Sequence, residues 1–297
     1  MEIIVGKTAG FCYGVKRAVE GTLKEIELND KKEIYCLGEL VHNKQVIKKL
    51  EKKGINIIST TDEINNNSKV IIRAHGIKKD IYENIKNNNC ELVDFTCPNV
   101  LRIHDIAEEY SNKNYYIFVI GSKTHPEVVG TVSYCGKYYS IIENEDDIND
   151  ALNKFKNTNI KKLLVIVQTT FSKHRFETIK DLIKSKLEKN IVLEIKDTIC
   201  LATEQRQEET EKMSKKVELM IIIGGENSSN TKKLYEIAKK HCLNAICIET
   251  SDDLKIKDIN NISRVGIMAG ASTPQESIDK VIEKLKKVFV YNDKMHK

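Results

Sequence analysis

The chain has 297 residues, a formal net charge of +5 and eight cysteines. Its length exceeds that of a typical single domain and predicts two or three domains. The sequence holds no run of about 18 consecutive apolar residues, which excludes a membrane-spanning helix. Residues 1–5 lack the basic segment and cleavage site of a secretory signal, so we expect a cytoplasmic protein with no membrane partner.

The cysteine count and the charge narrow the function further. Eight cysteines in a chain without an export signal favour metal binding or redox chemistry over a disulfide framework. The positive charge is dispersed, without a basic stripe or an aromatic-rich motif, which argues against a nucleic-acid partner. A small anionic ligand is compatible with this charge.

Apolar runs typical of buried strands alternate with amphipathic, helix-like segments along the chain, which predicts an α/β fold with mainly parallel sheets. Three of these runs lead through a cysteine into a helix. They are residues 3–5 before Cys12, residues 92–95 before Cys97 and residues 191–195 before Cys200. A thiolate in this position is stabilised by the N–H groups and the dipole of the helix start.

Each of these cysteines is followed by two further strand ends that carry polar side chains. The number of residues from the cysteine to each of these polar side chains is the same in the second and last thirds of the chain and differs somewhat in the first third. In chain order, the residues are His42 and His75, His125 and Thr169, and Ser228 and Ser272. Such self-similarity indicates repeated supersecondary units. We therefore predict three similar α/β domains at residues 13–96, 97–199 and 200–297, the last also taking the strand within residues 1–12.

The carboxyl ends of parallel strands lie at one edge of a sheet, where open α/β sheets bind ligands. If the three edges face one another, the cysteines and polar residues converge on one central site. The spacing leaves three uses of the thiols open. Zinc could take a histidine as fourth ligand, although the short C-x₂-C pair is absent. A cubane iron–sulfur cluster with one open iron suits three thiolates, although compact cysteine runs are commoner. A disulfide or thiol relay is the third use.

The polar residues favour an anionic ligand. Histidines can donate hydrogen bonds to phosphate and carry charge near neutral pH, and helix starts bind anions. The histidines are His42, His75 and His125, and the residues at expected helix starts are Ser228, Ser229, Asn230 and Ser272. The glycine-rich stretch at residues 224–230 matches neither a P-loop nor a dinucleotide fingerprint, which favours a small phosphorylated substrate over a nucleotide.

Glu127 is the one carboxylate among these strand ends that could relay a proton. The alternative interpretation is an ordinary acidic residue in the first turn of a helix. Three thiols, an anion site and a single acid together suggest reductive chemistry on a small phosphorylated molecule.

A series of motifs in this chain resembles one known family, in order and over almost the whole sequence. The motifs are Gly10-Phe11-Cys12-x-Gly14-Val15-x-Arg17-Ala18, Gly38-Glu39-Leu40-Val41-His42-Asn43, Ala74-His75-Gly76, Asp94-x-Thr96-Cys97-Pro98, His125-Pro126-Glu127-Val128-x-Gly130-Thr131, Gln168-Thr169-Thr170, Asp197-Thr198-Ile199-Cys200-x-Ala202-Thr203-x-x-Arg206-Gln207, Asn227-Ser228-Ser229-Asn230-Thr231 and Ala269-Gly270-Ala271-Ser272-Thr273-Pro274. The family is that of the 4-hydroxy-3-methylbut-2-enyl diphosphate reductases, which catalyse the last step of the non-mevalonate isoprenoid pathway.

The resemblance implies a pseudo-threefold trefoil of three α/β domains around a central 4Fe–4S cluster. Cys12, Cys97 and Cys200 would ligate the cluster and leave one iron open for the substrate hydroxyl. The diphosphate would be held by His42, His75, Ser228, Ser229, Asn230 and Ser272, with His125 and Thr169 close to the substrate. Glu127 would deliver protons while two electrons expel water, which gives isopentenyl and dimethylallyl diphosphate. The family's usual electron donors are ferredoxin and flavodoxin.

Two other classes of function stay open at this point. A non-redox iron–sulfur hydratase or lyase acting on a small phosphorylated substrate would use the open iron only as a Lewis acid and would need no reductant. A sensor with a structural metal would turn nothing over, and it needs no proton relay beside an anion site. The remaining cysteines are interpreted as small packing residues, and they are Cys36, Cys90, Cys135, Cys242 and Cys247. His104 is assigned no role.

Overall fold

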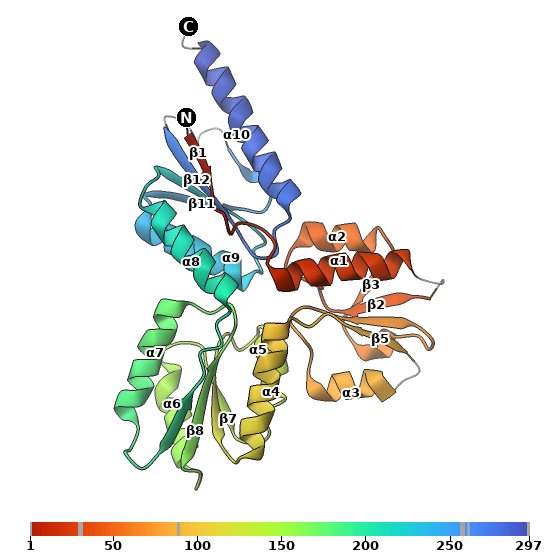
Figure 1. The fold of residues 1–297 in the computed structure, drawn as a ribbon, viewed down its shortest axis with the longest axis vertical. Coiled ribbons are helices and arrows are strands. Elements are labelled where there is room, and N and C mark those ends of the chain that lie inside the picture. The colour runs from red at the N-terminus through yellow and green to blue at the C-terminus, as the bar shows by residue number, and fades with distance from the viewer. Residues whose placement is uncertain (1, 29–31, 88–89, 256–258, 260–261, 296–297) are drawn as a thin grey trace. The chain divides into compact units, whose positions relative to one another are not determined.

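The structure is a computed structural model, drawn as a ribbon in Figure 1, and it describes residues 2–28, 32–87, 90–255, 259 and 262–295. Residues 1 and 297, the outermost residues of the predicted domains, lie outside these ranges. Strands and helices alternate along the described chain, and the strands form three four-stranded sheets. Every strand pair in these sheets is parallel. The α/β fold with parallel sheets that the sequence predicts is therefore confirmed.

The first sheet has the strand order β3-β2-β4-β5. Its strands are β2 (Ile34–Leu37), β3 (Ile55–Ile58), β4 (Lys69–Ile72) and β5 (Glu91–Asp94). The helices in this part of the chain are α1 (Tyr13–Glu27), α2 (Lys44–Glu51) and α3 (Lys79–Asn87), with the short 3₁₀ helix η1 (Thr61–Glu63) before β4.

The second sheet has the order β7-β6-β8-β9. Its strands are β6 (Tyr116–Ile120), β7 (Tyr139–Ile142), β8 (Lys162–Val167) and β9 (Val192–Ile195), and its helices are α4 (Pro98–Asn112), α5 (Pro126–Val132), α6 (Asp147–Lys156) and α7 (Lys173–Lys186). The third sheet has the order β1-β12-β10-β11. It consists of β1 (Glu2–Val5), β10 (Leu219–Ile223), β11 (Asn244–Ile248) and β12 (Arg264–Ala269), with α8 (Leu201–Ser214), α9 (Ser229–His241), η2 (Ser251–Asp253) and α10 (Gln275–Met295).

All three sheets repeat one strand order. The first strand of each repeat lies between the second and the third, and the fourth follows the third: β3-β2-β4-β5, β7-β6-β8-β9 and β11-β10-β12-β1. In the third sheet the fourth place is taken by the strand from the start of the chain. The point between the first and third strands, where the chain reverses its course across the sheet, is where open parallel sheets bind ligands.

The cores lie on both faces of the sheets, as the unbroken apolar sequences of the middle strands predict. Alternate residues of β6 enter two separate clusters: Phe118 packs in one, and Ile117 and Val119 pack in the other. Phe118 meets Phe155 of α6 edge to face with ring centroids 6.3 Å apart, a geometry that the aromatic quadrupoles favour. Because both faces are covered, the strand ends are the part of each sheet left for a binding site.

The chain divides into two compact units. Lys16–Val41 and Ile47–Cys200 contain the first two sheets, and we call them the two-sheet unit. Met1–Val15, His42–Val46 and Leu201–Lys297 contain the third sheet, and we call them the one-sheet unit. The domain boundaries at residues 13–96, 97–199 and 200–297 stay a prediction.

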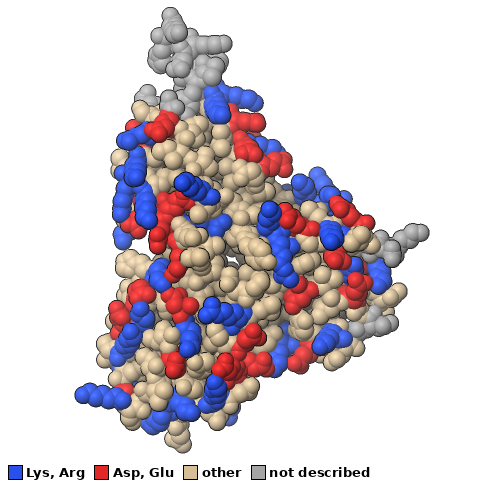
Figure 2. Space-filling model, viewed as in Figure 1, with Lys and Arg blue, Asp and Glu red and all other residues tan. Residues whose placement is uncertain are grey.

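Two surface properties bear on partners. Among the described residues, none of the helices combines the length and the apolar character needed to cross a membrane. On the face drawn in Figure 2, acidic and basic side chains are intermixed rather than gathered into a patch of one sign.

Candidate active site

The residues predicted to form the site follow the same three strands in every sheet. The cysteines follow the fourth strands: Cys97 after β5, Cys200 after β9 and Cys12 after β1. Polar residues follow the first strands: His42 after β2, His125 after β6 and Ser228 after β10. Polar residues also follow the third strands: His75 after β4, Thr169 after β8 and Ser272 after β12. The structure therefore places all of them at the carboxyl ends of strands.

Each of the three cysteines is tied through its backbone to the neighbouring strand end. The N–H of Cys97 donates to Ala74 O at 3.0 Å, that of Cys200 to Thr169 O at 3.1 Å, and that of Cys12 to Ala271 O at 3.1 Å. The acceptor is Thr169 itself or the residue directly before His75 or Ser272. In each sheet, the cysteine is thus fixed beside the polar residue that follows the third strand.

Each cysteine also directly precedes a helix, as the sequence predicts. Cys97 is the N-cap of α4, and α1 and α8 begin at the residues after Cys12 and Cys200. All three cysteines are partly buried. By contrast, Cys36 and Cys135 are fully buried, and burial raises the pKa of each thiol to about 12. A thiol with so high a pKa is inert, which agrees with the packing role expected for these two.

The other three cysteines differ among themselves. Cys242 is buried, as expected for a packing residue, and Cys90 is partly buried. Cys247 is exposed, which corrects its interpretation as a packing residue. The reason is its position on β11, the edge strand of the third sheet, where one flank of the strand has no neighbouring strand to cover it.

Glu127 lies in the first turn of α5 with only 2 % of its surface exposed. Thr169 binds both carboxylate oxygens: its N–H donates to Oε1 at 2.6 Å, and its Oγ1 donates to Oε2 at 2.7 Å. Burial raises the pKa of Glu127 to about 7. The two hydrogen bonds from Thr169 favour the charged form and act in the opposite direction, but burial is the larger effect. A carboxyl group with this pKa can hold and release a proton near neutrality.

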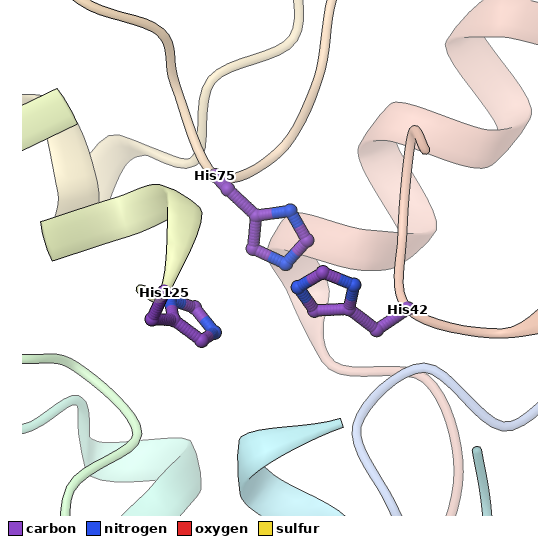
Figure 3. Close-up of side chains that lie close together, drawn as sticks. All are labelled: His42, His75 and His125. Carbon is purple, nitrogen blue, oxygen red and sulfur yellow. The ribbon is translucent and has the colours of Figure 1, made fainter. Parts of the chain in front are cut away.

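In the two-sheet unit, one histidine lies beside this acid and a second lies beside that histidine. His125 is the N-cap of α5, and its Nδ1 accepts a hydrogen bond from the N–H of Glu127 at 3.2 Å. Its ring meets that of His75 edge to face, with centroids 5.5 Å apart. Figure 3 shows His125 at the start of α5 and His75 on the turn after β4. The third side chain in that figure, His42, belongs to the one-sheet unit.

His104 is a feature of the site region that sequence reasoning missed. Its ring, on α4, is buried and stacks on Tyr134 with centroids 4.3 Å apart. Burial lowers the pKa of His104 to about 4, so the imidazole is neutral at physiological pH. A methyl group on Gly76 would lie 2.9 Å from His104 Cε1, and one on Gly130 would lie 3.6 Å from Nε2. The ring therefore supports both the turn beside His75 and the helix that carries Glu127.

The signal that could have located His104 is helical periodicity. His104 lies seven residues after Cys97 and shares a helix face with the buried Val100 and Ala107. Residues at such intervals are neighbours on a helix surface. The pattern places the ring on the buried side of α4, but it does not reveal the two glycines from other segments that pack against it.

In the one-sheet unit, the start of α9 has the features of an anion site. Ser228 is the N-cap, and its Oγ accepts a hydrogen bond from the N–H of Thr231 at 3.3 Å. Ser229 and Asn230 are the first two residues of the helix. Both polar atoms of the Asn230 side chain are buried, and among the described residues neither has a hydrogen-bond partner. Buried amide groups are almost always paired, so this one points to a ligand.

The loop that carries His42 is held by the third sheet. Ser272 donates its Oγ hydrogen bond to His42 O at 2.9 Å. Gln45 donates to Glu249 O at 3.0 Å and accepts from Ser277 Oγ at 3.1 Å. A methyl group on Gly225 would lie 2.9 Å from His42 O, so glycine permits this close approach. These bonds bring His42 together with Ser272 and place residues 42–46 within the one-sheet unit.

The fold and the strand-end residues indicate an α/β enzyme: the two-sheet unit carries two of the thiols and the buried acid, and the one-sheet unit carries the third thiol and a helix start with the features of an anion site. Comparison with known proteins identifies the family. The sequence profile described as LytB protein matches residues 3–286. The 4-hydroxy-3-methylbut-2-enyl diphosphate reductase of Thermoanaerobacter sp. (strain X514) is 38 % identical over 288 residues, which cover 96 % of this chain and 97 % of that protein. The reductase of the same name from Alkaliphilus oremlandii is 40 % identical over 286 residues, or 96 % of this chain and 99 % of that protein.

Solved structures agree with the sequence comparison. One is the structure of (E)-4-hydroxy-3-methyl-but-2-enyl diphosphate reductase, with a TM-score of 0.70, 34 % identity, and coverage of 97 % of this chain and 100 % of that chain. Another is the structure of the E-1-hydroxy-2-methyl-but-2-enyl-4-diphosphate reductase from Plasmodium falciparum, with a TM-score of 0.86 and 32 % identity. The match covers 95 % of this chain and 87 % of that chain. The chain belongs to the LytB family of 4-hydroxy-3-methylbut-2-enyl diphosphate reductases, and the resemblance seen in the motifs is confirmed.

The support that His104 gives to the Gly76 turn can be tested with two matched alanine variants. Gly76 has φ of +72° and Gly54 has φ of +103°, but a methyl group on Gly54 would meet nothing within 4 Å. Gly54→Ala should lose about 1 kcal/mol of unfolding free energy through left-handed strain alone and keep full turnover. Gly76→Ala should lose more and turn over about tenfold more slowly or worse, because His75 is displaced. Equal turnover of the two variants in a kinetic assay would contradict this role.

Proposed function

We propose that this chain reduces 4-hydroxy-3-methylbut-2-enyl diphosphate to isopentenyl and dimethylallyl diphosphate. The reaction takes up two electrons and two protons and releases the substrate hydroxyl as water. The observation that carries the proposal is membership of the LytB family, with 96 % of the chain aligned to a reductase of that name. The expected site residues lie beyond strand ends or in the first turns of the helices α5 and α9. The geometry adds a buried acid in the two-sheet unit and an anion site in the one-sheet unit.

We infer that Cys12, Cys97 and Cys200 hold a 4Fe–4S cluster with one iron left open. The residues fit this group, because each cysteine is partly buried, precedes a helix and is fixed by its own N–H bond. Helix starts favour the thiolate form that ligates iron. When bound, the cluster would supply the electrons and an iron that accepts the substrate oxygen.

The diphosphate is assigned to six residues. Asn230 supports this assignment most directly, because its buried amide has hydrogen-bonding capacity that the described residues leave unused. The start of α9 offers N–H groups and the positive end of the helix dipole. The six residues are His42, His75, Ser228, Ser229, Asn230 and Ser272.

Glu127 is assigned the proton transfer, with Thr169 and His125 beside the substrate. Its pKa of about 7 leaves a large protonated fraction at neutral pH. The N–H and Oγ–H of Thr169 each bind one carboxyl oxygen, which fixes the orientation of the carboxyl group. Electrons would come from a small redox protein such as ferredoxin or flavodoxin, and we expect the reaction to take place in the cytoplasm, where thiols stay reduced.

The assay that tests the function is anaerobic oxidation of reduced methyl viologen by the reconstituted protein. Adding 4-hydroxy-3-methylbut-2-enyl diphosphate should start rapid viologen oxidation, with isopentenyl and dimethylallyl diphosphate as products. Protein that contains the cluster but oxidises no viologen would refute the proposed reaction. Conversion of the substrate without any reductant would instead identify a non-redox hydratase or lyase.

Cluster ligation predicts a selective effect of cysteine substitution. Cys97→Ser should lose the cluster's visible absorbance and most of its bound iron, since the serine hydroxyl replaces a thiolate ligand. The matched control is Cys247→Ser, at an exposed cysteine within β11 that is not assigned to the cluster, which should keep both. Iron analysis and the absorption spectrum decide the matter, and a normal iron content in Cys97→Ser would exclude this ligand.

The proton-transfer role predicts a loss of turnover in Glu127→Gln. The isosteric amide keeps the fold and substrate binding, but turnover should fall by about a hundredfold or more. In the parent, kcat/KM should decline above about pH 7, because Glu127 loses its proton there, whereas the variant should be slow at every pH. Steady-state kinetics across pH 5–9 test both points, and parent-like turnover would remove Glu127 from the mechanism.

The same substitution has a stability signature with a definite sign. The pKa of Glu127 is raised in the folded protein, so folding is favoured while the carboxyl is protonated and is penalised once it ionises. Glu127→Gln should therefore melt at a higher temperature than the parent at pH 8. At pH 4, where the carboxyl is largely protonated both folded and unfolded, this advantage should disappear.

A further inference from the structure

An arginine on α1 holds the backbone that leads into Cys97. Arg17 donates from Nη1 to Thr96 O at 3.1 Å and from Nη2 to Asp94 O at 3.2 Å. Its guanidinium also lies over the ring of Phe95, with Cζ 5.6 Å from the centroid. The guanidinium therefore contacts all three residues before Cys97, although α1 itself begins directly after Cys12.

A second arginine, on α8, holds the backbone that leads into Cys12. Arg206 is 4 % exposed and donates from Nη2 to Gly10 O at 2.7 Å and from Nη1 to Ala202 O at 2.9 Å. One guanidinium thus joins the first turn of α8 to the residue two before Cys12. Helix α8 begins directly after Cys200, so again the helix that follows one cysteine holds the approach to another.

The approach to Cys12 is the longest of the three and has a further attachment to α8. Strand β1 ends at Val5, whereas β5 ends at Asp94 and β9 at Ile195, each closer to its cysteine. Glu209, three residues after Arg206, accepts hydrogen bonds from Lys7 N at 2.7 Å, Thr8 N at 2.9 Å and Thr8 Oγ1 at 2.5 Å. Residues three apart on a helix face the same side, so Arg206 and Glu209 together hold the connection from β1.

We propose that Arg17 and Arg206 are positioning residues that hold Cys97 and Cys12, respectively, in the geometry that the metal cluster requires. Each cysteine is then fixed on two sides. Its own N–H binds the neighbouring strand end, and the arginine binds the backbone that precedes it. A guanidinium presents a rigid planar fork that directs separate N–H groups at two carbonyl oxygens, whereas the ammonium of lysine is a single donor centre on a flexible stem. The inference rests on the proposed function, because it takes these cysteines as cluster ligands.

The experiment measures the alkylation rate of each cysteine in the metal-free full-length protein, with iodoacetamide as the probe and peptide mass spectrometry as the readout. Arg17→Met should raise the rate at Cys97 by about tenfold or more, the factor expected when hydrogen bonds from a charged donor are lost, and leave Cys12 unchanged. Arg206→Met should raise the rate at Cys12 and leave Cys97 and Cys200 unchanged. In each variant, the affected cysteine is therefore the distant one rather than the one that precedes the substituted helix.

Two lysines provide matched controls on the same helices. Lys16→Met on α1 and Lys212→Met on α8 remove exposed charges and should change no alkylation rate. If Arg206→Met does not fold, Arg206→Lys keeps the charge but not the fork, and it should raise the Cys12 rate in the same direction. Either variant that fails to raise the rate at its distant cysteine would overturn the proposal. So would an equal rise at all cysteines, including the buried Cys36 and Cys135, because that result reports general loosening.

A second readout uses the reconstituted protein and separates this inference from the proposed function. Iron release to a chelator should be about tenfold faster from Arg17→Met and Arg206→Met than from the parent, which corresponds to ~1.4 kcal/mol. Parent-like release would contradict the positioning role while leaving the cluster assignment intact. A parent protein that binds no iron–sulfur cluster would refute the proposed function instead, and the alkylation pattern would still decide whether the arginines position the cysteines.

Discussion

The hydrogen bond from each site cysteine to the end of the neighbouring strand is the constraint on which the rest of the structure depends. The third and fourth strands of each repeat pair in a fixed parallel register. The carbonyl of the second residue beyond the third strand therefore comes within reach of the residues beyond the fourth. A cysteine N–H can then bind there, as in all three sheets. The thiol and the polar side chain that follows the third strand are thereby brought to the same sheet edge.

Thr169 shows how this constraint extends into the chemistry. Its carbonyl accepts the N–H of Cys200, while its own N–H and Oγ–H bind the carboxyl of Glu127. One residue thus connects a proposed cluster ligand to the proposed proton donor. Burial and hydrogen bonding act in opposite directions on the pKa of Glu127, and burial dominates. At His104 burial also dominates, but there the result is a neutral ring that supports neighbouring turns.

The sequence predicts the sheets and the strand-end residues because both depend on local order along the chain. Apolar runs locate the strands, and repeated intervals locate the polar residues that follow them. Helix ends are less well determined: the pattern after Cys200 indicates a helix but does not fix that α8 ends at Ser214, because capping and fraying decide the last residues. The contacts of Arg17, Arg206 and His104 were not predictable, since each joins segments far apart in the chain. The exposure of Cys247 was missed because periodicity does not tell an edge strand from a central one.

The place of β1 in the third sheet has a consequence for how the protein is made. β1 is the first strand of the described chain, yet its partner β12, which begins at Arg264, is the last. At roughly 5–20 residues per second, the ribosome takes on the order of 10–50 s to reach that partner. During this interval both sheets of the two-sheet unit can be completed, whereas Cys12 has no strand end to bind. Maturation of the site must therefore wait until β12 has been synthesised, whatever the supply of iron and sulfide.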